Sequence, residues 1–278
     1  NVGKSSLYNA LAKKQQAIVA DRAGTTRDVN RTLVRYMERE VEIFDTAGIR
    51  RSGRIDRGVE HFSVLRSLQA IEQSDICLLL IDANELSVAL DQKIAGLIKE
   101  AGKGLILVVS KWDIKEKDAY TIDEISPGIA HDFNFVPWAP LIFTSSETGK
   151  NVTKIFDLAL EIMQRRTQTI STRDLNNWLK KVTTRHPPAG LKNRQPKLRY
   201  MVQEEGNPIP AFKVFGSQTK FLHWSYRRHM ERMMREQWDY IGTPIQLWFI
   251  DRDVEKERDE KFGGRKFKNN GNRDRVKK

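Results

Sequence analysis

Apolar runs alternate with amphipathic segments along the first part of the chain. Residues 105–109 are apolar at every position, which is typical of a strand buried on both faces of a parallel sheet. Apolar residues at 152–163 recur instead at helical spacing. We expect strands at 31–35, 41–45, 76–82, 105–110 and 140–144, and helices at 58–73, 90–101 and 152–165. This alternation predicts a doubly wound α/β domain with a mostly parallel sheet.

The pattern changes after residue 167. Ser171 can cap a helix that runs to about Arg185 and stops before Pro187. Strands at 197–203 and 211–215, a helix at 219–239 and a strand at 245–250 complete an α-β-β-α-β order. We therefore predict an α/β domain at 1–167, a smaller α+β domain at 168–250 and a basic disordered tail at 251–278.

The long helix at 219–239 has two contrasting faces. Its apolar face carries Leu222, Tyr226, Met230 and Met233, and its opposite face carries Arg228, Arg232 and Arg235. The first set predicts a core stripe. The second predicts a surface that could follow the phosphates of RNA, although an ordinary solvated face is the alternative.

The positive charge lies in the second half of the chain. The net charge is +12. Residues 1–163 contain 21 Lys and Arg against 23 Asp and Glu, or −2; residues 164–250 contain 16 against 6, or +10; and residues 251–278 contain 11 against 7, or +4. A basic second domain beside a nearly neutral first one suggests a nucleic-acid partner.

The sequence predicts neither a membrane-spanning segment nor a disulfide bond. No apolar run is long enough to span a bilayer, and no signal segment precedes one. The single cysteine, Cys77, falls in an apolar run and is expected to be a buried, inert thiol. We expect a cytoplasmic protein.

The first candidate chemistry is a phosphate-binding loop at the start of the chain. Backbone N–H groups at a helix start can bind phosphate, a lysine neutralises its charge, and a serine hydroxyl can hold Mg²⁺. Here Lys4 and Ser5 would take those two roles. The expected nucleotide contacts in this segment are Asn1, Val2, Gly3, Lys4, Ser5 and Ser6.

Two elements that could respond to a γ-phosphate follow. Thr26, or its neighbour Thr25, can complete the Mg²⁺ shell when that phosphate is present. The second element follows the strand at 41–45, at the sheet edge where nucleotides bind in open α/β folds. Its expected contacts are Asp45, Thr46, Ala47, Gly48 and Ile49.

Two further segments can select guanine. Asp113 ends a motif after the buried strand, and one carboxylate there accepts from N1–H and N2–H₂ of guanine together, a donor pair that adenine lacks. The Lys111 stem can cover the base plane. The other predicted base contacts are Ser110, Trp112, Ser145 and Ser146.

Together the motifs resemble the EngA (Der) family of bacterial tandem GTPases, across residues 1 to about 250. The segments 24–28, 45–51 and 111–113 carry the resemblance in the first domain, and 186–188 and 242–245 carry it in the second. It implies a P-loop GTPase domain, with its first strand missing here, followed by a KH-like domain. It also implies a further GTPase domain upstream.

The resemblance implies a function as well. Family members hydrolyse GTP with Mg²⁺ and act in assembly of the large ribosomal subunit, with its rRNA as partner. Lys4, Thr26 and Asn1 become candidate catalytic residues, Asn1 as a ligand of K⁺. Ile49 stands where Ras-like proteins have a water-orienting glutamine, and Ser110 where the family usually has asparagine.

Two other readings stay open. The chain could be a ribosome-binding or RNA-binding module whose GTPase fold has little or no turnover. A tRNA-modifying GTPase would fit the threonine element at 25–28 but not the basic second domain. Residues 168–250 contain no Gly-x-x-Gly loop, the segment with which KH domains clamp an RNA backbone.

Overall fold

The structure is a computed structural model, and it describes residues 2–14, 31–44, 68–83, 89–113 and 121–251. These residues form two compact units. Unit 1 comprises residues 1–168 with two later segments, 206–210 and 234–245, and unit 2 comprises 169–205, 211–233 and the residues from 246 onward. No helix of the described residues is long and apolar enough to cross a membrane.

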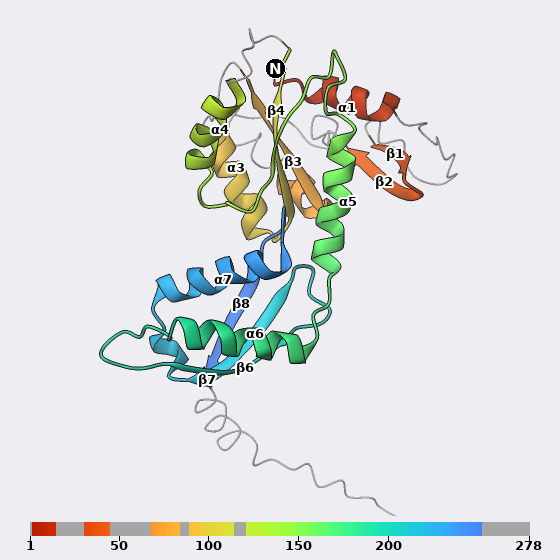
Figure 1. The fold of residues 1–278 in the computed structure, drawn as a ribbon. Helices are drawn as coiled ribbons and strands as arrows, with labels where there is room; N and C mark the ends of the chain where they lie inside the picture. The colour runs from red at the N-terminus through yellow and green to blue at the C-terminus, as the bar shows by residue number, and fades with distance from the viewer. Residues whose placement is uncertain (1, 15–30, 45–67, 84–88, 114–120, 252–278) are drawn as a thin grey trace, which may run out of the picture. The chain divides into compact units, whose positions relative to one another are not determined.

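The described residues of unit 1 form two sheets (Figure 1). Strands β1 (Arg31–Tyr36) and β2 (Arg39–Phe44) form an antiparallel hairpin. Its two turn residues, Met37 and Glu38, both have positive φ, as a tight hairpin turn that follows the strand twist requires. The second sheet has the order β3-β4-β5 and is parallel throughout, with β3 at Ile76–Asp82, β4 at Gly104–Ser110 and β5 at Leu141–Phe143.

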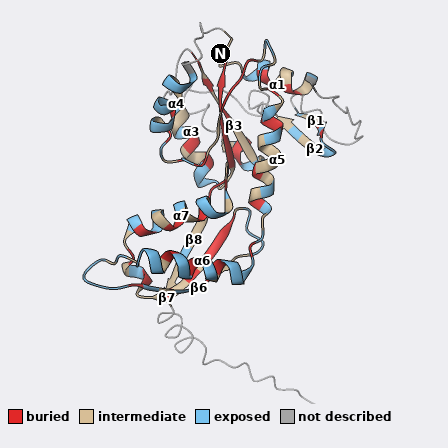
Figure 2. Cartoon of the chain, viewed as in Figure 1, coloured by how far each residue is buried: buried red, intermediate tan, exposed pale blue. Residues whose placement is uncertain are grey.

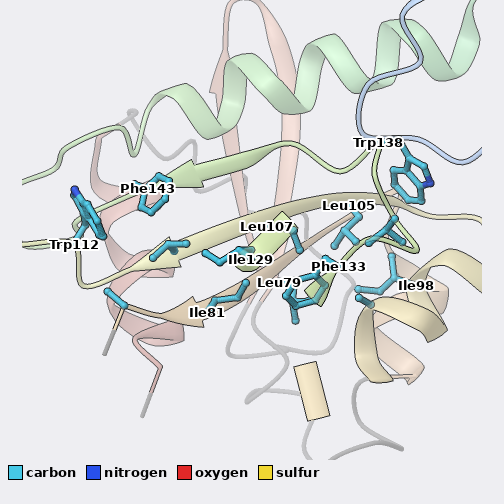
Figure 3. Packing of buried hydrophobic residues seen from close by; sticks show 14 of the residues in the cluster. Leu79, Ile81, Ile98, Leu105, Leu107, Trp112, Ile129, Phe133, Trp138 and Phe143 are labelled. Carbon is cyan, nitrogen blue, oxygen red and sulfur yellow. The ribbon is translucent and has the colours of Figure 1, made fainter. Parts of the chain in front are cut away.

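Strand β4 is buried at every position because helices cover both faces of its sheet. Leu105, Leu107 and Val109 point into a cluster shared with helices α3 (Ala89–Glu100) and α4 (Thr121–Asp132), which Figure 3 shows from close by. Ile106 and Val108 point to the opposite cluster, shared with α1 (Lys4–Lys14) and α5 (Lys154–Thr167). Alternation along one apolar strand thus builds both cores of the unit, and Figure 2 shows this strand in the buried colour.

The two later segments of unit 1 are joined to it by backbone hydrogen bonds and by a buried arginine. Gly242 N–H donates to Trp138 O (2.7 Å), and Leu105 N–H donates to Gly242 O (2.9 Å). Arg166 is only 9% exposed, and its guanidinium donates to Thr243 Oγ1, Gly102 O and Pro208 O at 2.8–3.1 Å. One side chain at the end of α5 therefore satisfies acceptors from three separate stretches of chain.

Unit 2 contains a three-stranded sheet of order β6-β7-β8. Its elements are α6 (Thr172–Arg185), β6 (Lys197–Gln203), β7 (Ala211–Ser217), the short 3₁₀ helix η2 (Thr219–Phe221), α7 (Trp224–Trp238) and β8 (Gln246–Asp251). β6 pairs antiparallel with β7, and β7 pairs parallel with β8. The boundary between the two units falls within α7.

Side chains fix α6 on this sheet. Ser171 caps the helix, since its Oγ accepts from Asp174 N–H at 3.1 Å. The Asn176 amide donates to Met201 O and accepts from Met201 N–H, both at 2.9 Å. This two-way bond holds the helix against the middle of β6, and the α-β-β-α-β order expected from the sequence is confirmed.

Some local expectations were wrong. The helix at 219–239 begins only at Trp224, because η2 precedes it and His223 Nδ1 accepts from Ser225 N–H as a cap (3.2 Å). Its second core methionine, after Met230, is Met234, which is fully buried, rather than Met233. Cys77 is partly exposed rather than fully buried, although burial still raises the pKa of its thiol. Of the expected helix at 58–73, only residues 68–73 are described, and they are helical.

Candidate nucleotide-binding site

The phosphate side of the site is the start of α1. Gly3 has φ +87°, a left-handed conformation that favours glycine, and its carbonyl accepts the first helical bond from Leu7 N–H (2.9 Å). Buried Leu7 and Leu11 hold the helix against its sheet, while Lys4 and Ser5 are exposed at its first turn. The helix start thus presents backbone donors, a cation and a hydroxyl, with no acidic residue in the first turn.

Ser110 joins this loop to the central sheet. It is the last residue of β4 and is 3% exposed. Its Oγ lies 2.7 Å from Val2 O and 3.2 Å from Ile81 O, so its single proton is donated chiefly to the phosphate-side loop. A Cβ on Gly3 would lie 4.0 Å from Ser110 Oγ, at ordinary contact distance, so the positive φ rather than a lack of space favours glycine there. The serine therefore makes the brace between the two halves of the site.

The base side of the site is the loop that follows β4. Lys111 has φ +56°, so the chain turns sharply directly after the strand. Trp112 then enters the core at 1% exposure, and its ring lies 4.5 Å from that of Phe143 (Figure 3). This anchor fixes the position from which Asp113, the predicted guanine acceptor, follows.

A second loop lies beside the first one. Trp112 N–H donates to Thr144 O (3.1 Å), which joins the loop after β4 to the loop after β5. Ser145 is buried, and its Oγ accepts from Thr148 N–H at 3.1 Å, while its own N–H donates to Lys150 O. The predicted base contacts at 110–113 and 145–146 are therefore brought to one edge of the parallel sheet, the edge expected for a nucleotide.

Lys111 makes a contact that the sequence analysis missed. Its Nζ lies 2.6 Å from Asp82 Oδ2 in a partly buried ion pair. Asp82 ends β3 and is in register with Ser110, so the two strands deliver the acid and the lysine to the same place. One signal in the sequence could have identified this ion pair: an acidic residue ends one apolar strand, and Ser-Lys ends the next apolar strand along the chain.

Several predicted site residues lie outside the described residues. They are Asn1, Thr26 and the segment Asp45, Thr46, Ala47, Gly48 and Ile49. The described part of the chain contains no cluster of three or more His, Cys, Asp or Glu side chains that could hold a metal. The exposed hydroxyl of Ser5 at a helix start suits a Mg²⁺ ion that is bound mainly by phosphate oxygens, so the donor set fits magnesium bound with a nucleotide. The roles of all these residues stay predictions.

Known families match both parts of the chain. Residues 1–111 match a family described as 50S ribosome-binding GTPase. Residues 169–249 match a family described as the C-terminal KH-domain-like domain of EngA bacterial GTPase enzymes. The first match includes Ser110 and Lys111, and the second covers most of unit 2.

Curated relatives match nearly all of the chain. It is 44% identical over 259 residues to GTPase Der of Chloroflexus aggregans, covering 93% of this chain and 58% of the relative. It is 40% identical over 257 residues to GTPase Der of Herpetosiphon aurantiacus, covering 92% and 56%. The chain thus spans somewhat more than half the length of the curated relatives that it matches. Among solved structures, Era of Aquifex aeolicus bound to GDP.AlF4⁻ gives a TM-score of 0.43 at 21% identity over 95% of each chain, too low to add to the assignment.

The two family matches occur in the chain order of the EngA family, and the identity to relatives named GTPase Der extends across both. The chain therefore belongs to the EngA (Der) family, of which it contains a GTPase domain and the C-terminal KH-like domain.

Proposed function

We propose that this protein binds and hydrolyses GTP and that its nucleotide state controls association with the large ribosomal subunit during assembly. The observation that carries the proposal is the brace of Ser110, which ties the phosphate-side loop to the base-side loop at one sheet edge. A site that binds the phosphates and the base of one nucleotide at the same time needs its two loops held at a fixed separation, and such a connection provides this. The family description and the relatives named GTPase Der support the same reading.

Each side chain has a chemical task in this proposal. Lys4 neutralises phosphate charge, and the N–H groups at the start of α1 bind phosphate oxygens. Ser5 and Thr26 would hold Mg²⁺, which when bound neutralises charge that develops on the phosphates. Asp113 selects guanine, with the neighbouring loop at Ser145 beside it.

GTP hydrolysis also needs a group that stabilises the charge developing on the phosphates. Ile49 has no hydrogen-bonding group with which to orient water, so charge stabilisation must come from elsewhere. We assign Asn1 as a ligand of K⁺ in the role of an arginine finger. Hydrolysis measured in K⁺ and in Na⁺ at equal ionic strength tests this assignment, because equal rates in the two salts contradict it.

The ribosome partner is supported by the family description and by the excess of basic residues at 164–250. Such a protein acts in the cytoplasm. The test is co-sedimentation with purified large and small ribosomal subunits in the presence of GDP or a non-hydrolysable GTP analogue. We expect binding to the large subunit that is stronger with one nucleotide. Binding to the large subunit that is equal with both nucleotides, together with no turnover, would instead favour the RNA-binding module without GTPase activity.

A further inference from the structure

An exposed tryptophan begins α7 in unit 2. Trp224 is 58% exposed, whereas Tyr226 and Met230 on the other face of the helix are buried. Burying a tryptophan ring would stabilise the fold through the hydrophobic effect. Because this ring stays largely in water, it contributes little to the packing of the unit. Exposed aromatic rings beside positive charge can serve as stacking surfaces for nucleic-acid bases.

One cation contacts this ring, and three more lie over aromatic rings of the same unit. The Arg228 guanidinium lies 4.7 Å from the Trp224 ring centre, one helical turn further on. Arg227 shares the same helix face and lies 4.9 Å from the ring of Phe249. Lys220 and Arg194 are both held over the ring of Phe221, at 5.4 and 5.5 Å, directly before the helix. We call Trp224 and these four cations, Arg194, Lys220, Arg227 and Arg228, the aromatic-basic patch.

The four cations of the patch outnumber the two carboxylates, Glu231 and Asp251, that the described residues place near them. None of its four cations forms an ion pair with a carboxylate in the part of the chain that the structure describes. Glu231 follows Arg227 by one turn of α7. Asp251 Oδ2 accepts from Thr219 N–H at 3.1 Å, directly before Lys220 in the chain. Four cations held on aromatic rings beside an exposed indole complement a ligand that is both polyanionic and flat.

We propose that the aromatic-basic patch binds single-stranded RNA, with an unpaired base stacked on Trp224 and the backbone phosphates held by the four cations. Unpaired bases stack on aromatic rings and on guanidinium planes, and both surfaces are present here. In a duplex the bases are stacked on each other, so the patch should prefer single strands. The proposal rests on the ribosome association above, and it identifies a contact that does not need the Gly-x-x-Gly loop that residues 168–250 lack.

The test uses the 278-residue chain and a twelve-nucleotide oligouridine that carries one 2-aminopurine, whose fluorescence falls when it stacks. Trp224→Ala should weaken binding roughly 5- to 100-fold and abolish the quenching, while Trp224→Phe should keep most of both. Trp248→Ala is the matched control, because Trp248 is a partly exposed tryptophan (36%) on β8 of the same unit. Unfolding curves should be unchanged for Trp224→Ala.

Charge gives an independent readout. Arg228→Ala should lower the slope of log K against log salt concentration by about 0.7, the value for one contact to a single-strand phosphate. The same RNA annealed to its complement should bind more weakly than the single strand. Oligoglutamate of equal charge should compete poorly, whereas equal competition would show a surface for acidic peptides and overturn the proposal.

Two further results would overturn it. One is no saturable binding of the oligonucleotide by the parent chain, and the other is an affinity of Trp224→Ala within twofold of that of Trp248→Ala. Co-sedimentation of the same variants with large subunits separates this failure from failure of the proposed function. A parent chain that sediments with the large subunit, with Trp224→Ala unchanged in the RNA assay, refutes the patch alone. A parent chain that never sediments with the large subunit refutes the proposed function.

Discussion

Replacing Arg166 with methionine tests how the later segments of unit 1 are held in place. The change removes a buried guanidinium and the three hydrogen bonds that it donates to Thr243, Gly102 and Pro208. Methionine keeps most of the apolar stem, so the loss is mainly polar. Burial lowers the pKa of Arg166, as expected for a charge that is costly to bury. The three acceptors satisfy its N–H groups in place of water.

The magnitude follows from the acceptors left behind. Each buried oxygen that loses its donor costs about 1 kcal/mol or more. Methionine carries no charge that must be desolvated, and this gain offsets part of the cost. We therefore expect the free energy of unfolding to fall by about 3 kcal/mol, near the lower end of the range for broken buried pairs. For a unit of this size that corresponds to a fall in Tm of roughly 6–12 °C.

Urea and thermal unfolding of the full chain measure the effect. Arg173→Met is the control, because Arg173 is exposed in the first turn of α6 and the same substitution there should cost less than about 0.5 kcal/mol. Arg166→Lys should recover only part of the loss, since one ammonium group cannot reproduce the spread of the guanidinium donors. If Arg166→Met unfolds like Arg173→Met, the buried arginine does not hold these segments.

Three other changes test the site and the core. Ser110→Ala should weaken GDP binding about 5- to 10-fold through loss of its 2.7 Å bond to Val2 O. Ser126→Ala removes an exposed 2.6 Å serine-to-carbonyl bond of α4 and should leave GDP binding unchanged, so equal affinities for the two variants would refute the brace. Gly242→Ala should lower the free energy of unfolding by about 3 kcal/mol, because at φ +66° its Cβ would lie 2.2 Å from the Ile162 side chain of α5. Gly206→Ala has a similar φ of +77° but open space around the Cβ, and should cost about 1 kcal/mol. Similar losses for the two variants in urea unfolding would contradict the clash. Since burial raises the pKa of Cys77, iodoacetamide should alkylate its thiol more slowly in the folded chain than in the urea-unfolded chain near pH 8, and the rate should rise as the pH approaches the raised pKa. The free energy of unfolding should fall as the pH rises from the ordinary thiol pKa toward the raised one, because only the unfolded chain loses the proton in that range. Equal alkylation rates at pH 8 would show that the thiol is not desolvated.

The sheet and the sequence of elements could be predicted because apolar periodicity reports burial directly. Residues 105–109 have no polar position, and the strand there is buried throughout. Helix α4 was not predicted, because Pro127 and Gly128 form a pair that usually signals a turn. Ile125 and Ile129 of this helix and Phe133 directly after it keep helical spacing, and this could have revealed the helix.

The site was predictable only where a local motif carries the chemistry. Motifs predict where Gly3 and Ser110 lie, and their roles toward a nucleotide stay predictions. The ion pair of Asp82 with Lys111 depends instead on two strands far apart in sequence being in register. Arg166 at the end of a helix had the pattern of an exposed basic terminus, and its burial depends on segments that come later in the chain. Such contacts cannot be read from periodicity, because they are set by tertiary packing.

The central claim, a guanine-specific nucleotide site, is tested most directly by titrating fluorescent GDP into the chain with Mg²⁺ and competing with unlabelled GDP, GTP, ADP and xanthosine diphosphate. We predict saturable binding that GDP and GTP displace and ADP does not. Asp113→Asn should shift the preference from guanine to xanthine, because the amide donates where the carboxylate accepted. No saturable binding, or displacement by ADP as effective as that by GDP, would contradict the account.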